Sequence, residues 1–144
     1  MTKVFIDGSA GTTGLRIADR LANRSDLTIL TLTGDARKDP QARKEALFES
    51  DIAFLCLPDA AAKEAVALAE GSKVRIIDTS TAHRTADGWT YGFPELVGAD
   101  TIAASKRIAN PGCHASGFVA LVAPLVRAGL IAADAKLTCF SLTG

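Results

Sequence analysis

An excess of charge of one sign, a metal-binding pattern and a long apolar run are all missing from this sequence of 144 residues. Its 16 Lys and Arg residues balance its 16 Asp and Glu residues, so we expect no electrostatic attraction to nucleic acid or to an anionic membrane surface. No apolar run approaches the roughly 20 residues that span a bilayer, and the N-terminus shows no signal-peptide pattern. The three cysteines (Cys56, Cys113 and Cys139) have no metal-like spacing, which predicts reduced thiols, no bound metal and a cytoplasmic location.

Strand-like and helix-like segments alternate along the first half of the chain. Short apolar runs predict strands at residues 3–8, 27–34, 51–59 and 73–78, and the segments 15–24, 41–50 and 60–71 have helical composition or spacing. This alternation predicts an α/β fold, a Rossmann-like parallel sheet with right-handed crossovers.

The alternation ends after Asp78. Residues 79–98 predict one long loop, which in a compact domain is usually functional. A helical turn (99–105), a strand (106–110), a helix (113–129) and a final strand (136–142) follow. Cys56 and Cys139 are therefore expected inside strands. Because the sequence stops directly after a strand, we expect residues 1–144 to be a domain cut short before a second one.

Glycines recur every third residue between the first strand and the first helix. Such glycines permit a tight turn and allow backbone N–H groups to approach a pyrophosphate at the helix N-terminus, and the hydroxyl groups add donors. A plain strand-to-helix turn is the alternative. The predicted cofactor-binding residues of this loop are Gly8, Ser9, Ala10, Gly11, Thr12, Thr13 and Gly14.

The end of the second strand bears on the choice of cofactor. An acid here usually holds the ribose hydroxyls of NAD, whereas a basic residue accommodates the 2′-phosphate of NADP. The sequence offers both, Asp35 and then Arg37 and Lys38. Two cations favour NADP(H), although an ordinary solvated loop would have the same composition.

Cys113 lies between the turn Asn110–Pro111–Gly112 and a predicted helix. Backbone N–H groups at a helix N-terminus favour the ionised thiol, and in a parallel sheet this junction lies at the carboxyl edge, where ligands bind. A small buried hydrophobic residue is the other interpretation. His114 next to it points about 100° away on a helix and is not expected to act as its base.

Four motifs occur here in one order: GSAGTTG, IIDTSTAHR, YGFPEL and ANPGCHAS. Together they resemble the N-acetyl-gamma-glutamyl-phosphate reductase family of arginine biosynthesis, in its shorter type 2 subgroup, over essentially the whole chain. The resemblance implies an NADPH-dependent enzyme in which Cys113 is the nucleophile that forms a thioester with a small acyl-phosphate substrate. It also implies substrate contacts from Ser80, His83, Arg84 and Asn110, and cofactor contacts from Cys56 and Pro58.

In length the sequence differs from that family. Members are about twice as long, and their second α+β domain carries the acid/base histidine and shares the substrate site. We therefore expect this polypeptide alone to be inactive, and the full-length protein to be a homo-oligomer. Loop-stabilising contacts by Ser80, His83 and Arg84 remain an alternative. So do two other functions, an aspartate-semialdehyde dehydrogenase-like reductase and a non-catalytic dinucleotide-binding module.

Overall fold

The computed structural model describes residues 1–142, and its elements follow the predicted α/β order. The strands are β1 (Thr2–Asp7), β2 (Leu27–Leu30), β3 (Ile52–Leu55), β4 (Arg75–Asp78), β5 (Thr90–Tyr91) and β6 (Arg107–Ala109). The helices are α1 (Thr12–Leu21), a 3-10 turn η1 (Gly34–Arg37), α2 (Pro40–Glu49), α3 (Asp59–Leu68), α4 (Pro94–Val97), α5 (Ala99–Ala104) and α6 (Cys113–Arg127).

All six strands form one parallel sheet in the order β2-β1-β3-β4-β6-β5. The predicted parallel α/β architecture is therefore confirmed. The order reverses direction between β1 and β3, which places the carboxyl ends of these two central strands on either side of the switch point where doubly wound sheets bind ligands.

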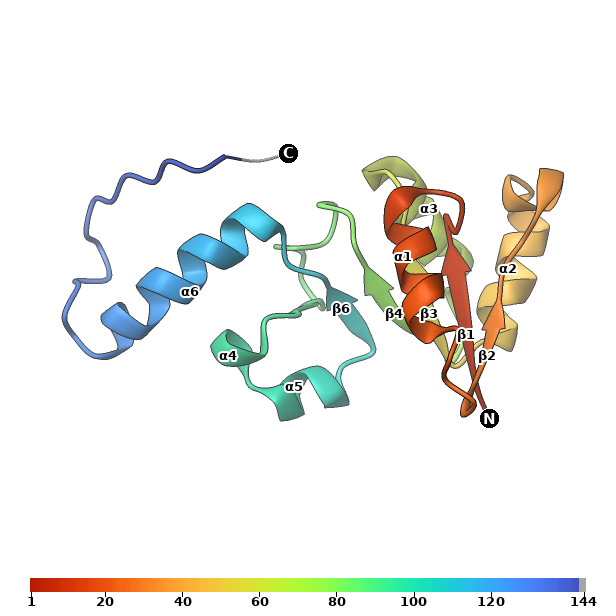
Figure 1. The fold of residues 1–144 in the computed structure, drawn as a ribbon, viewed down its shortest axis with the longest axis horizontal. Coiled ribbons are helices and arrows are strands. Elements are labelled where there is room, and N and C mark those ends of the chain that lie inside the picture. Colours follow the sequence, from red (N-terminus) through yellow and green to blue (C-terminus); the bar gives the residue numbers. More distant parts are fainter. Residues whose placement is uncertain (143–144) are drawn as a thin grey trace.

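The two faces of the sheet are covered unequally. In β3 and β4 alternate residues are fully buried, and these side chains (Ala53, Leu55, Ile76 and Asp78) face one layer. That layer contains α2 and α3, which contribute Leu47 and Ala65 to the core cluster around Phe5. Helix α1 lies in front of the sheet and α3 behind it (Figure 1).

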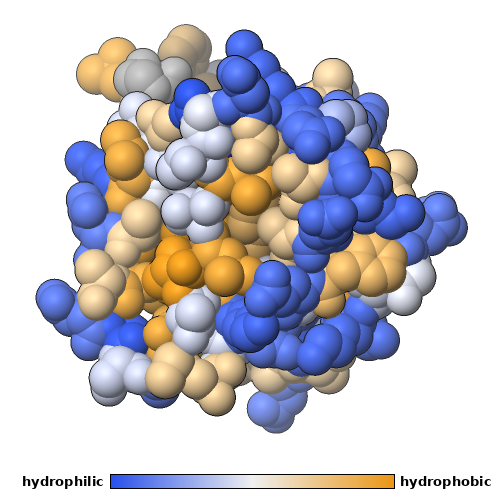
Figure 2. All heavy atoms as spheres, turned by 90° about the vertical axis from the view of Figure 1, so that its right-hand side faces the viewer, coloured by the Kyte–Doolittle hydropathy of each residue, from blue (hydrophilic) through white to orange (hydrophobic). Residues whose placement is uncertain are grey.

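Strand β2 is one edge of the sheet, and each of its four residues is half-buried. Figure 2, which looks onto this side of the molecule, shows hydrophobic surface at its centre with hydrophilic side chains around it. A shallow depression beside this edge is lined by Ile29, Leu30 and Leu32 together with Ala42 and Ala46 of α2.

Three predictions of local structure need correction. The segment 79–98 is not one loop, because β5 pairs with β6 and α4 forms a single turn after it. Strand β3 ends at Leu55, so Cys56 follows the strand instead of lying in it. Cys139 is exposed and lies in irregular chain, since residues 136–142 pair with no strand of the described sheet.

Helix α6 stands apart from the sheet (Figure 1). None of its residues is fully buried, and its last turn is held by Arg127, which donates to the carbonyl oxygens of Glu95 (2.8 Å) and Leu96 (2.5 Å). No described helix is both long enough and apolar enough to cross a bilayer.

Candidate cofactor and thiol site

The glycine-rich segment 8–14 forms the turn after β1 and the first residues of α1 at the carboxyl edge, and two of its glycines are required by packing. Gly8 has φ = +85°, and a Cβ there would overlap the carbonyl oxygen of Cys56. A Cβ at Gly14 would overlap the carbonyl oxygen of Gly8 and approach Ser9 Cα to 2.8 Å. These two glycines bring the loop, β3 and α1 into close contact.

Gly11 is different, because a Cβ there would meet only the Gly8 carbonyl oxygen, at an ordinary 3.5 Å. Gly11 is the N-cap of α1, and no side chain of residues 1–142 caps that first turn. Thr12 and Thr13 follow it and are exposed. Free backbone N–H groups at a helix N-terminus, with hydroxyl groups beside them, fit a pyrophosphate.

Beneath the glycine loop lies a buried ion pair that the sequence did not reveal. Arg43 of α2 donates from Nε to Asp7 Oδ2 (3.0 Å), and both side chains are nearly inaccessible. The same guanidinium contacts Glu64 Oε1 (3.2 Å) and the carbonyl oxygen of Ala61 (3.4 Å) of α3. Burial raises the pKa of Asp7, and the charge of Arg43 opposes that rise. The pair therefore joins β1, α2 and α3 under the loop.

The predicted cofactor-selecting residues lie together after β2. Asp35, Arg37 and Lys38 are exposed in and after η1, and Arg37 Nε is 3.3 Å from the carbonyl oxygen of Gly34. Their basic groups remain accessible to a phosphate at this strand end.

Cys56 lies against the glycine loop, and Pro58 follows it at the start of α3. The backbone N–H of Cys56 donates to the carbonyl oxygen of Asp7 (2.8 Å), and Pro58 is the exposed N-cap of α3. Burial raises the pKa of the Cys56 thiol to about 11, so this cysteine stays protonated near neutral pH.

Asp78 organises the loop that follows β4. Its carboxylate is completely buried and accepts hydrogen bonds from Ser80 N (3.0 Å), Ser80 Oγ (2.7 Å) and His83 Nδ1 (2.6 Å). The His83 ring also stacks on Trp89, with a centroid separation of 4.1 Å. Ser80 and His83 thus direct their polar atoms inward. This agrees with a loop-stabilising role, the alternative to substrate contact for these two residues.

A second carboxylate fixes the same loop from α3. Asp59 accepts from the N–H (3.0 Å) and the hydroxyl group (2.5 Å) of Thr81. These hydrogen bonds hold the pKa of Asp59 below its usual value.

Arg84 connects this loop to the turn before Cys113. It is half-buried and donates from Nε to the carbonyl oxygen of Asn110 (3.1 Å) and from Nη2 to that of Thr79 (3.3 Å). Its third nitrogen, Nη1, has no hydrogen-bond acceptor among residues 1–142. The N–H groups of Nη1 are therefore left for a ligand.

Cys113 is the first residue of α6 and is exposed, with Gly112 as the N-cap and no side-chain cap in the described part of the chain. The strand β6 that leads to it pairs with β4, so the thiol and the Asp78 loop follow neighbouring strand ends. An accessible thiol at a helix N-terminus is the environment of reactive cysteines.

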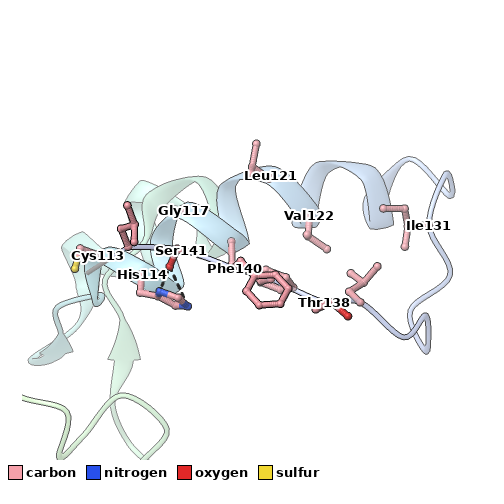
Figure 3. Close-up of a pocket in the computed structure, with 13 residues that line it drawn as sticks. Cys113, His114, Gly117, Leu121, Val122, Ile131, Thr138, Phe140 and Ser141 are labelled. Carbon is pink, nitrogen blue, oxygen red and sulfur yellow. Dashed lines mark hydrogen bonds between the residues drawn. The ribbon is translucent and has the colours of Figure 1, made fainter. Parts of the chain in front are cut away.

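A groove of about 470 Å³ lies between α6 and residues 137–142, with Cys113 and His114 at one end (Figure 3). His114 Nδ1 is hydrogen-bonded to Ser141 Oγ in this groove. Most of the remaining lining is apolar, including Leu121 and Phe140, so the groove offers little to an acyl-phosphate anion.

Sequence reasoning missed the buried acidic residues behind the site. Asp7 and Asp78 each end an apolar strand, which was the available signal, because an acid is fully buried only when it has partners. Their partners, Arg43 and His83, come from other elements, and their proximity depends on the tertiary fold.

A glycine loop at the switch point and an exposed thiol on the same edge define a dinucleotide-binding domain that carries a candidate nucleophile. The family profile described as "Semialdehyde dehydrogenase, NAD binding domain" matches residues 3–105, and the chain belongs to this family.

Curated relatives extend this similarity over almost the whole chain. The chain is 56% identical over 143 residues to N-acetyl-gamma-glutamyl-phosphate reductase 2 of Pseudomonas putida, and 52% identical over 143 residues to the N-acetyl-gamma-glutamyl-phosphate reductase of Burkholderia ambifaria. These alignments cover 98% of the chain but 46% and 45% of the relatives, so the chain spans about half of their length. Together the family and the relatives support NADP(H) as the cofactor.

Among solved structures, the chain resembles the aspartate semialdehyde dehydrogenase of Francisella tularensis. The TM-score is 0.68 at 19% identity, over 90% of this chain and 42% of that one. At this identity the likeness supports the fold alone.

Proposed function

We propose that this chain is the cofactor-binding and nucleophile-bearing domain of an NADPH-dependent reductase that converts N-acetyl-gamma-glutamyl phosphate to the corresponding semialdehyde in arginine biosynthesis. The observation that carries the proposal is the placement of Cys113, exposed at the start of α6, in a chain about half identical to relatives with that name.

The chemistry assigned to Cys113 explains why a thiol is needed. Its thiolate attacks the acyl carbon, a C–S bond forms, the C–O bond to phosphate breaks, and phosphate leaves with the bonding electrons. A dinucleotide held by residues 8–14 would supply the hydride for reduction of the thioester carbonyl. The resulting alkoxide reforms a C=O bond and expels the Cys113 thiolate, which releases the aldehyde and regenerates the nucleophile.

Residues 8–14 are assigned to the pyrophosphate of the cofactor, because the α1 N-terminus and the exposed Thr12 and Thr13 provide donors there. Arg37 and Lys38 are assigned to the 2′-phosphate, which makes NADPH the preferred cofactor. Cys56 and Pro58 are assigned to cofactor contacts through backbone and ring atoms, because the Cys56 thiol is protonated near neutral pH.

For the substrate we assign Arg84 and Asn110. Nη1 of Arg84 is the free donor next to the turn, and Asn110 is exposed. The hydrogen bonds of Ser80 and His83 to Asp78 favour an indirect role for these two residues, which is to hold the loop in place.

The proposed enzyme is cytoplasmic and homo-oligomeric, and it acts on a small molecule. Residues 1–144 form its cofactor domain, and the remaining half of the relatives' length supplies the second domain with the acid/base histidine. The isolated chain is expected to bind NADPH but to turn over no substrate.

The test is an assay of the chain together with the remaining half of the relatives' length. We expect NADPH oxidation with N-acetyl-gamma-glutamyl phosphate, abolished by Cys113→Ser and retained by Cys139→Ser. A faster reaction with aspartyl phosphate would instead support the aspartate-semialdehyde dehydrogenase-like alternative, whose fold is shared. No reduction of either substrate, with NADPH still bound, would support the non-catalytic module.

A further inference from the structure

The turn that leads to Cys113 has all of its carbonyl oxygens occupied. Asn110 O accepts from Arg84 Nε (3.1 Å), Pro111 O from Asn110 Nδ2 (3.1 Å), and Gly112 O from the N–H (2.9 Å) and the hydroxyl group (2.8 Å) of Ser116. One of these donors, Arg84, comes from a different part of the chain. The orientation of the turn therefore depends on Arg84.

The backbone of Gly112 does not require glycine. Its dihedral angles, φ = −77° and ψ = 147°, are accessible to any residue. The space beside Gly112, in contrast, is occupied by Arg84, because a Cβ at Gly112 would lie 2.6 Å from Nη1 and 3.2 Å from Cζ of Arg84. The guanidinium thus packs directly against the Gly112 Cα, and the lack of a side chain is what admits it.

The loop that carries Arg84 is itself fixed by the buried Asp78. His83, the preceding residue, is fixed by its hydrogen bond to Asp78 and by stacking on Trp89. Asp78 also accepts the N–H of Asn110 at its backbone oxygen (2.7 Å). Asp78 therefore fixes both the loop that carries Arg84 and the turn at Asn110 to which Arg84 donates.

We propose that Arg84, in addition to the substrate contact assigned to its Nη1, is a positioning residue for Cys113, and that Gly112 is glycine in order to leave room for its guanidinium. The inference deepens the proposed function, on which it rests for the role of the thiol. Arg84 sets the turn so that the Cys113 sulfur is held at the N-terminus of α6, and it places a fixed cation beside the peptide that precedes the thiol. Both effects hold the accessible sulfur at a helix N-terminus, which is the environment of reactive cysteines.

The test measures alkylation of Cys113 by iodoacetamide at neutral pH in the chain itself, by peptide mass spectrometry. Cys139, exposed in the same molecule, is the internal reference. Arg84→Met and Gly112→Ala should both lower the Cys113/Cys139 rate ratio several-fold. Arg84→Lys should not restore it, because an ammonium group cannot reach both carbonyl oxygens in the planar geometry of guanidinium.

Gly117→Ala is the matched control, since it lies one turn along α6 and a Cβ there would meet nothing within 4 Å. It should leave the ratio unchanged. The double variant Gly112→Ala with Arg84→Met should be no slower than Arg84→Met alone, because the methyl group then has no guanidinium to displace.

An unchanged ratio in Arg84→Met, or additive losses in the double variant, would overturn the proposal. Full rescue by Arg84→Lys would replace positioning with a purely electrostatic role and would also overturn it. Thermal melting of each variant shows whether it is folded. Unfolding would also be visible in the alkylation data, because the Cys113/Cys139 ratio would then approach that of the denatured chain. The assay needs no substrate, so it can fail while reductase activity is found, and it can succeed while the proposed substrate is wrong.

Discussion

Asp78 Oδ2 and His83 Nδ1 are 2.6 Å apart inside the protein, where the carboxylate is fully buried and the imidazole nearly so. A buried carboxylate is tolerated only with such partners. The pair therefore ties the end of β4 to the loop that carries Arg84.

The first prediction concerns this pair. Asp78→Ala removes three hydrogen bonds to a buried carboxylate and should lower the free energy of unfolding by about 3 kcal/mol, the scale of lost hydrogen bonds to charged groups. Urea denaturation of the isolated chain measures it. Asp87→Ala, at an exposed position of the same loop, is the control and should change stability by less than about 0.5 kcal/mol. Equal effects of the two substitutions would contradict the role of Asp78.

The second prediction concerns Asp7 and Arg43. Arg43→Met leaves the Asp7 carboxylate buried without its cation and should cost about 3–5 kcal/mol at pH 7. Because the pKa of Asp7 is then raised further, the loss should shrink as the pH falls and the acid becomes protonated. The double variant Arg43→Met with Asp7→Leu should recover most of the stability. Chemical denaturation at pH 4 and pH 7 compares them, and a pH-independent loss would be evidence against the ion pair.

The third prediction separates two glycines of the loop. Gly8→Ala forces a Cβ onto the Cys56 carbonyl at a positive φ and should destabilise the fold strongly. Gly11→Ala meets no close atom, so the protein should fold normally but bind NADPH more weakly if the pyrophosphate approaches Gly11. Thermal melting and fluorescence titration with NADPH give the two readouts. Normal NADPH affinity in a folded Gly11→Ala variant would count against this location of the pyrophosphate.

The fourth prediction tests cofactor choice. Arg37→Ala with Lys38→Ala should weaken NADPH by roughly 1–3 kcal/mol and leave NADH nearly unchanged, because only NADPH has the 2′-phosphate. Arg24→Ala, an exposed arginine paired with Asp26, is the control. Titration of both cofactors by fluorescence measures the difference. Equal losses for NADPH and NADH would refute the assignment.

The order of elements was predictable because it depends on local patterns. The apolar run of β1 and the glycines after it indicated a strand-turn-helix unit, and this unit is present; α1, however, begins at Thr12 and not at the predicted residue 15, so Gly14 lies inside the helix. The prediction of a final strand was wrong, because an apolar segment becomes a strand only when another strand pairs with it, and Cys139 has no such neighbour among residues 1–142. Pairing across the sheet cannot be derived from local sequence.

The local positions of the candidate site residues were predictable, but their contacts across the fold were not. The position of Cys113 followed from its turn and helix, but the contact of Arg84 with Gly112 joins segments 28 residues apart, the difference between the two residue numbers. The inward orientation of Ser80 and His83 likewise depends on Asp78, whose burial was not predicted although it ends an apolar strand. Contacts that depend on tertiary packing were the part left undetermined.

The last prediction compares the three thiols of one molecule. Cys56 should alkylate slowly near neutral pH and speed up as the pH approaches its pKa of about 11, because burial favours its protonated form. Because the pKa of Cys56 is raised, the free energy of unfolding should fall as the pH rises from the unfolded thiol value of 9.0 toward about 11. Cys56→Ala should abolish this fall.

Cys139 is exposed, so it is not protected by a strand as the sequence suggested, and it reports the rate of an ordinary accessible thiol. Cys113 should react fastest at pH 7, because it lies at a helix N-terminus next to the fixed Arg84 turn. Isotope-coded alkylation followed by peptide mass spectrometry resolves the three rates. Cys113→Ser should leave NADPH affinity unchanged, because the role proposed for Cys113 is in acyl transfer and not in cofactor binding. If Cys113 and Cys139 react at the same rate, Cys113 has no special environment in this chain, and the nucleophile assignment would lose its structural support.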